Sequence, residues 1–128
     1  HVWGYGAGLD MTRRDLQFAL RDKGRPWELG KAFDRSAPIS PLVAVAAAGP
    51  MDRAPIWLKV NGQLRQSAQV ADMIWSVPEI IANLSTYFRL EPGDLIFTGT
   101  PEGVGPVVAG DVIEAGVDGV GSLSVRIV

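Results

Sequence analysis

The sequence predicts a β-rich α+β domain, because it contains many short strand signals and only two helix signals. Most segments between turn residues are short and either apolar or alternating, which is typical of strands. Only residues 12–23 and 76–88 carry apolar residues at helical spacing. The 128 residues are 47% hydrophobic and 20% charged, the composition of a globular domain with a buried core.

The first third of the chain is predicted to begin with a strand over residues 1–9, with Trp3 and Tyr5 on one face and glycines on the other. Glycine inside a strand indicates close approach of another backbone or a ligand. Residues 12–23 are predicted to form a helix with a T-x-x-D start at its first residue, and Gly24 ends it.

The middle of the chain is predicted to contain a loop, a buried strand and a hairpin. The loop covers residues 24–40, and the apolar run at 41–48 favours a strand closed by a Gly-Pro pair. Residues 56–60 alternate, and residues 63–70 return as their partner strand. The Asn61-Gly62 pair between them suits a type I′ turn, which requires two residues with positive φ.

A second helix is predicted from Ser76 onward, with a Ser76–Glu79 capping box and an early proline. Its buried stripe is predicted to contain four apolar residues, Ile80, Ile81, Leu84 and Phe88. The remaining expected elements are a turn, a strand, a glycine-rich loop and two last strands, at residues 91–94, 95–98, 99–107, 111–117 and 122–128.

Composition also limits the class of partner and compartment. A net charge of −2 argues against nucleic acid, and the longest apolar run is far too short to span a membrane. The absence of cysteine excludes a disulfide scaffold and a thiolate metal site, and fits a cytoplasmic protein. Since the chain starts at His1 and enters strand-like sequence at once, we expect it to be a piece of a longer protein.

The densest run of functional residue types is residues 8–17. Asp10 precedes the first predicted helix, and Arg14 and Gln17 follow at +4 and +7, which would place all three on one helical face. A carboxylate followed by an arginine and an amide suits a metal or anion site. The alternative is that Asp10 or Thr12 caps the helix and Arg14 is its solvated partner. One Asp cannot hold Mg²⁺ alone, so further acidic ligands are required.

Two other segments carry candidate chemistry. Lys31 stands between small residues beside an aromatic one, where it can reach into a cavity and neutralise an enolate or carboxylate oxygen. The Thr98-Gly99-Thr100 run ends a predicted strand, and its hydroxyls and backbone N–H groups suit a substrate carboxylate. The alternatives are a solvated loop lysine and a β-turn whose glycines serve backbone geometry.

Two familiar sites do not fit the sequence. Gly4, Gly6 and Gly8 have the spacing G-x-G-x-G instead of G-x-G-x-x-G, and Asp10 would place a negative charge where a dinucleotide pyrophosphate binds. His1 is the only histidine, and its place at the first residue argues against a role as a base, so we expect no Ser-His-Asp triad within the chain.

Five motifs in one order carry a resemblance to a known family. The motifs are residues 8–17, 30–34, 60–66, 72–76 and 90–105. With them the chain resembles the fumarylacetoacetate hydrolase family, in its short acylpyruvase branch, along its whole length. The resemblance implies a mixed β-sandwich roll with two short helices, of which residues 1–128 are the C-terminal portion of the catalytic domain and the N-terminal part is absent.

The resemblance also implies a metal site. A divalent ion, Mg²⁺, Mn²⁺ or Ca²⁺, is held by three carboxylates in such proteins. Asp10 matches the third, whereas the Glu-x-Glu pair and the His–Glu pair that activates water match nothing in this chain. Lys31 matches the catalytic lysine that faces the metal-bound oxygens. The residues that match substrate-binding positions are Arg14, Gln17, Thr98, Gly99 and Thr100.

The function implied by the resemblance is hydrolysis of the C–C bond of an acylpyruvate such as fumarylpyruvate, a keto acid of aromatic catabolism, to pyruvate and a carboxylic acid. The alternatives are oxaloacetate decarboxylation, isomerisation of a 2-hydroxy-dienedioate, and a non-catalytic fragment that lacks a complete metal site. A homodimer is expected, with the apolar Ile74-Trp75 pair as a candidate contact. Arg13 stands where a small residue is frequent in the family.

Overall fold

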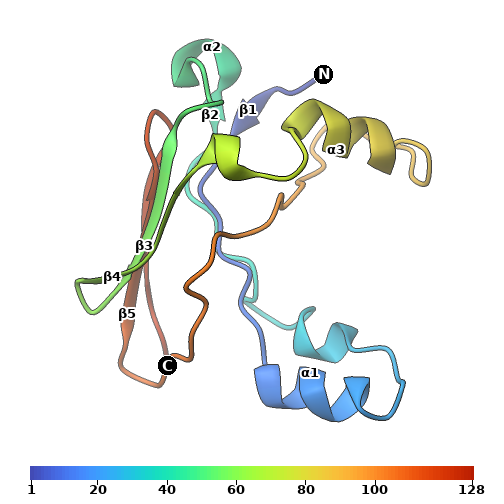
Figure 1. Ribbon diagram of the computed structural model, residues 1–128, viewed down its shortest axis with the longest axis vertical. Helices are drawn as coiled ribbons and strands as arrows, with labels where there is room; N and C mark the ends of the chain where they lie inside the picture. Colours follow the sequence, from blue (N-terminus) through green and yellow to red (C-terminus); the bar gives the residue numbers. More distant parts are fainter.

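A four-stranded antiparallel sheet carries the core of the protein (Figure 1). The structure, a computed structural model, describes all residues from 1 to 128. The sheet contains the predicted hairpin and the two predicted last strands. In spatial order its strands are β4 (Gln63–Gln69), β3 (Pro55–Val60), β5 (Val112–Val117) and β6 (Gly121–Arg126).

The turn between β3 and β4 confirms the prediction made from the Asn-Gly pair. Asn61 and Gly62 have φ values of 51° and 77°, as a type I′ turn requires. The Asn61 side chain donates a hydrogen bond to Asp111 and accepts one from the backbone N–H of Val112. The tip of the hairpin is therefore tied to the start of β5.

A β-bulge interrupts the pairing of β3 with β4. Leu58 pairs with Gln66, but the next residue of β3, Lys59, pairs with Leu64, so Arg65 is the extra residue. Because paired residues point to the same face, Gln66 lies on the face of Leu58 and Leu64 on the opposite one. The face shared by Leu58 and Gln66 is the inner one, since Leu58 packs against the buried residues of β5.

The core consists of two small clusters on this inner face, and the N-terminal segment contributes to both. Leu9 packs with Ile113 and Ala115, and Ala7 belongs to the second cluster. Residues 1–9 were predicted to be one strand, but only β1 (Gly4–Tyr5) and a bridge at residue 8 are regular. The predicted role of glycine is borne out at Gly4, where a Cβ would collide with the carbonyl oxygen of the paired strand.

The first helix, α1 (Arg14–Arg21), begins two residues later than predicted. The T-x-x-D start does not cap it: Arg13 occupies the N-cap position and no side chain bonds there. The hydroxyl of Thr12 is engaged elsewhere, as described below. The helix was also predicted to bury its apolar stripe of Leu16, Ala19 and Leu20, but its one buried residue is Gln17.

Two predicted strands are absent or shortened. In the run 41–48 only β2 (Val43–Ala44) pairs, with β1, and α2 (Val45–Ala48) follows, because consecutive alanines favour a helical turn. Residues 95–98 form no strand. The backbone of residues 95–107 makes no backbone–backbone hydrogen bond, and a strand exists only where a neighbouring strand pairs with it.

The second helix, α3 (Val77–Leu84), confirms the predicted start: the N–H and hydroxyl of Ser76 both donate to the Glu79 carboxylate. Its predicted buried stripe is wrong, because no residue of α3 is buried and Phe88 beyond it is 64% exposed. Figure 1 shows α3 set apart from the sheet.

No helix in the structure is long and apolar enough to cross a membrane. The remaining regular elements are two short 3₁₀ turns, η1 (Glu28–Gly30) and η2 (Val70–Asp72).

Candidate functional site

Asp10 and Lys31, which are 21 residues apart in the sequence, form the centre of the candidate site. The Lys31 Nζ donates to Asp10 Oδ2 at 2.6 Å and to Thr12 Oγ1 at 2.9 Å. The pair is placed by the backbone: residues 9, 11 and 13 donate hydrogen bonds to the carbonyl groups of residues 38, 36 and 30. The segment before α1 thus runs beside the loop that carries Lys31.

Neither alternative role of Asp10 and Thr12 is observed. Their side chains do not cap α1, since Thr12 accepts a bond from Lys31 and donates one to the backbone oxygen of Asp10 at 3.5 Å. Arg14 is not the partner of Asp10 either. The structure therefore brings Asp10 together with Lys31, and the helical face that sequence reasoning proposed contains only the other two residues.

Those two residues, Arg14 and Gln17, do lie together on α1. The Arg14 Nη1 donates to Gln17 Oε1 at 2.7 Å, and Gln17 is 5% exposed. Gly30 of η1 makes this burial possible, because a Cβ on Gly30 would lie only 3.1 Å from the Gln17 Cβ. The close contact fixes α1 against η1, and Lys31 follows η1 directly.

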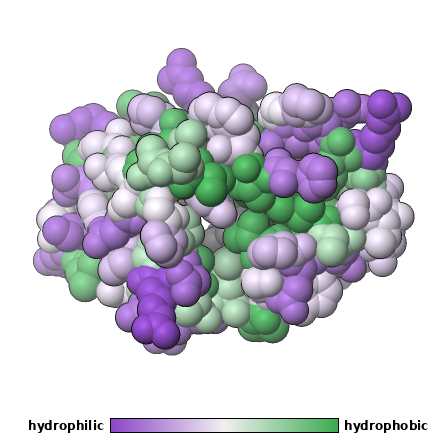
Figure 2. Space-filling model, turned by 90° about the horizontal axis from the view of Figure 1, so that it is seen from above, coloured by the Kyte–Doolittle hydropathy of each residue, from purple (hydrophilic) through white to green (hydrophobic).

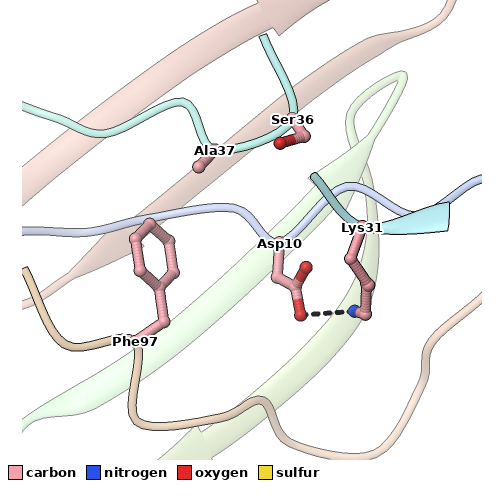
Figure 3. Close-up of a pocket in the computed structure, with 5 residues that line it drawn as sticks. All are labelled: Asp10, Lys31, Ser36, Ala37 and Phe97. Carbon is pink, nitrogen blue, oxygen red and sulfur yellow. Dashed lines mark hydrogen bonds and ion pairs between the residues drawn. The ribbon is translucent and has the colours of Figure 1, made fainter. Parts of the chain in front are cut away.

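The carboxylate of Asp10 and the ammonium of Lys31 face a cavity of about 290 Å³ (Figure 3). Ser36, Ala37 and Phe97 complete its lining. Phe97 comes from the segment predicted to be a strand, so this segment brings its aromatic ring to the site without pairing in a sheet. The side chains of Asp10 and Lys31 are 58% and 35% exposed, which leaves both accessible to a ligand.

Lys31 also lines a second cavity of about 290 Å³, together with Trp27, Glu28 and two small residues. Lys31 thus lines both cavities. The neighbouring Arg13 contacts an aromatic side chain of the loop that carries Lys31. The Arg13 guanidinium lies 4.4 Å from the centre of the Phe33 ring, in a cation–π contact.

The Thr98–Thr100 run continues directly from the cavity wall at Phe97. Its Thr100 hydroxyl oxygen accepts a hydrogen bond from Gln66 Nε2 at 2.8 Å, whereas Thr98 and Gly99 make none. Sequence reasoning assigned no role to Gln66. The available signal was a polar side chain at an inward position of β4, where the strand pattern calls for an apolar one.

Asp10 fits a divalent cation as one ligand. A carboxylate oxygen is the donor that Mg²⁺ and Mn²⁺ prefer, and Oδ1 of Asp10 has no partner. The structure contains no group of three His, Asp or Glu side chains that could hold a metal. A metal here would therefore need ligands in addition to those that residues 1–128 bring together.

The sequence model of the family described as fumarylacetoacetate (FAA) hydrolase C-terminal matches residues 1–128. The crystal structure of fumarylpyruvate hydrolase from Pseudomonas aeruginosa in complex with Mn²⁺ and pyruvate is 57% identical, with a TM-score of 0.96 over 100% of this chain and 55% of that one. This similarity confirms the predicted α+β fold class.

Two curated relatives differ in their named activity. The fumarylpyruvate hydrolase of Ralstonia sp. is 53% identical over 98% of this chain and 65% of its own length. The mitochondrial oxaloacetate tautomerase of Homo sapiens is 46% identical over 99% of this chain and 58% of its own length. The chain thus spans between about half and two thirds of the length of the relatives it matches.

Proposed function

The chain belongs to the FAA hydrolase C-terminal family, and from this premise we propose that it is the C-terminal portion of a divalent-metal-dependent enzyme that hydrolyses the C–C bond of an acylpyruvate such as fumarylpyruvate. The observation that carries the proposal is the Asp10–Lys31 pair at a cavity. It lies in a chain 57% identical to a fumarylpyruvate hydrolase whose crystal structure contains Mn²⁺ and pyruvate. The products are pyruvate and a carboxylic acid.

In this proposal Asp10 supplies one carboxylate ligand, and two glutamates of the longer protein supply the others. The bound ion, Mg²⁺ or Mn²⁺, supplies Lewis-acid stabilisation of the negative charge on the α-keto acid. Asp10 also holds the Lys31 ammonium beside this position, since their charged atoms are 2.6 Å apart. The single carboxylate therefore organises both positive charges of the site.

Lys31 stabilises the pyruvate enolate that forms when the C–C bond breaks. Its ammonium carries three N–H donors, of which two point at Asp10 and Thr12. The third is available to the developing enolate oxygen. A fixed positive charge placed beforehand lowers the barrier more than a solvated one, because it need not reorganise during the reaction.

Arg14, Gln17 and Thr100 bind and orient the substrate carboxylate. Gln17 is buried and accepts a hydrogen bond from Arg14, so it limits the directions in which the guanidinium can point. The remaining guanidinium N–H groups are available for an anion. Thr98 and Gly99 belong, with Thr100, to the proposed binding loop. Holding the carboxylate aligns the scissile bond with the attacking water.

Tautomerisation of oxaloacetate is the second candidate, favoured by the relatives of that name at 46–47% identity. Decarboxylation of oxaloacetate and isomerisation of a 2-hydroxy-dienedioate belong to the same class, because each reaction passes through an enolate, whose negative charge a divalent ion held at Asp10 would stabilise. The site described here would bind the shared α-keto-carboxylate end of each substrate. The reactions differ in what happens at the distal carbon.

The test uses the full-length protein with Mn²⁺ or Mg²⁺ and compares fumarylpyruvate with oxaloacetate. We expect stoichiometric release of pyruvate from fumarylpyruvate, loss of activity with a chelator, and loss of metal binding in calorimetry for Asp10→Asn. Asp15→Asn, an identical change at an exposed residue of α1, is the matched control. Enol–keto conversion of oxaloacetate without pyruvate release from any acylpyruvate would replace the first proposal with the second. Absence of metal binding would indicate a non-catalytic protein.

A further inference from the structure

The loop of residues 95–107 has one polar anchor. It makes no backbone–backbone hydrogen bond. Its only hydrogen bonds come from one side chain of β4: Gln66 Nε2 donates to Thr100 Oγ1 at 2.8 Å and to the carbonyl oxygen of Pro101 at 2.7 Å. Gln66 therefore supplies the hydrogen bonds that join the loop to the sheet.

The orientation of the Gln66 amide follows from its partners. A carbonyl oxygen can only accept a hydrogen bond, so the amide nitrogen, which carries both N–H groups, must face Pro101. The same nitrogen lies beside Thr100, and the threonine oxygen is thus an acceptor. Since a hydroxyl has one proton, the O–H of Thr100 remains free to donate to a further acceptor.

The backbone around Gln66 is also fixed. Gln66 is 8% exposed, and it follows the bulge at Arg65, a feature that re-aims side chains next to functional sites. The loop approaches β4 again at Gly103, which has a φ of 98°. The two backbones are so close there that a Cβ on Gly103 would collide with the Arg65 carbonyl oxygen. Two consecutive residues of β4, Arg65 and Gln66, therefore lie against the middle of the loop, at residues 100–103.

We propose that Gln66 is a positioning residue that fixes the polarity of the Thr100 hydroxyl, so that Thr100 donates its proton to a substrate carboxylate. The proposal rests on the proposed function, since that function places a carboxylate at Thr100. An amide in this position leaves a donor facing the anion. A carboxylate in the same position would accept the hydroxyl proton and repel the anion.

The test is a set of variants in the full-length, Mn²⁺-loaded protein. For Gln66→Glu and for Thr100→Val we expect KM for fumarylpyruvate to rise about tenfold or more, with kcat changed much less, because the lost bond is made to the bound carboxylate. In the double variant, Gln66→Glu should add less to Thr100→Val than it adds to the wild type, because only its negative charge then acts on the anion. Gln63→Glu, the same change at an exposed residue of β4, should leave KM unchanged.

Pyruvate affinity, measured by calorimetry on the same Mn²⁺-loaded proteins, separates this inference from the proposed function. If acylpyruvates are not turned over but pyruvate binding is weakened equally by both single variants, the function is wrong and the role of Gln66 stands. Additive effects of the two changes, or a Gln66→Glu variant that behaves like Gln63→Glu, overturn the inference. A wild-type protein that binds no pyruvate overturns both.

A variant that does not fold is recognised by thermal unfolding and replaced by Gln66→Met. Methionine has a similar volume and no N–H group, so it removes the hydrogen bonds without adding a charge. We expect a smaller increase in KM than for Gln66→Glu, in the same direction, and no further increase in the Thr100→Val background, because methionine acts on the anion only through Thr100. An additive increase contradicts the proposal.

Discussion

At the scale of single residues, the site shows what sequence motifs capture and what they miss. The importance of Asp10 and Lys31 was predicted from the family resemblance, and the structure adds their 2.6 Å contact. Local helix geometry predicted that Arg14 and Gln17 share a face, and they do. It placed Asp10 on that face as well, which is wrong, because the helix begins after Asp10. A contact across 21 residues is set by the fold and has no local signal.

Replacement of Lys31 by alanine should lower kcat for acylpyruvate hydrolysis by about 100-fold or more, because a fixed positive charge beside the enolate is lost. The free energy of unfolding should change by less than about 1 kcal/mol, since exposed ion pairs contribute little. Steady-state kinetics and urea unfolding measure the two effects. Lys23→Ala, which removes the same charge from an exposed residue after α1, should change neither. Full activity of Lys31→Ala would remove this lysine from the mechanism.

At the scale of elements, the predictions succeeded where local rules decide. The hairpin was predicted because the Asn61-Gly62 pair itself adopts the required positive φ values. The helix start at Ser76 was predicted for the same reason. The prediction of a strand at residues 95–98 was wrong, because strand pairing depends on a neighbouring strand that the local sequence does not reveal. The packing of α1 on η1 was missed likewise, although it positions Lys31.

Gly30→Ala tests this packing. The new Cβ would lie 3.1–3.2 Å from the Cβ and backbone of Gln17, so η1 and α1 would have to separate. We expect a loss of stability of about 1–3 kcal/mol, as for other overpacked contacts, and a lower kcat because Lys31 moves with η1. Urea unfolding and kinetics measure both. Gly105→Ala, where a Cβ would meet nothing within 4 Å, is the control, and equal effects of the two changes would contradict the argument.

Asp111 gives the hairpin junction a defined response to acid. Hydrogen bonds from the Val108 backbone and from the Asn61 side chain lower the pKa of Asp111 below its ordinary value of 3.8. Since the folded pKa lies below the unfolded one, the stabilisation is present above about pH 4 and is lost as pH falls through the folded pKa. The difference in urea midpoint between wild type and Asp111→Asn should therefore shrink below pH 4. A difference that stays constant from pH 7 to pH 3 would contradict this assignment.

At the scale of the whole molecule, the structure exposes far more surface than a compact protein. Its accessible surface is 9136 Å², against about 6,600 Å² for a compact monomer of this mass. Figure 2 shows apolar side chains gathered around a hollow on one face. Many large exposed apolar residues lie in one segment, residues 74–97, which contains α3 and is called the arm. They are Ile74, Trp75, Tyr87, Phe88, Leu95 and Phe97. The sequence could not reveal this exposure, because amphipathic spacing indicates burial without saying what covers the apolar face.

The excess of roughly 2,500 Å² exceeds the ~800 Å² that each partner contributes to a standard interface. We therefore expect this arm to be covered in the full-length protein, with Ile74, 97% exposed, in a homodimer contact. Ile74→Glu should weaken dimerisation about 100-fold, because it places an unpaired charge in an apolar interface. Sedimentation equilibrium measures the dissociation constant. Leu64→Glu, the same kind of change near the tip of the β3–β4 hairpin, which lies away from α3 (Figure 1), should leave it unchanged. A wild-type monomer, or a dimer unaffected by Ile74→Glu, would show that another surface covers the arm.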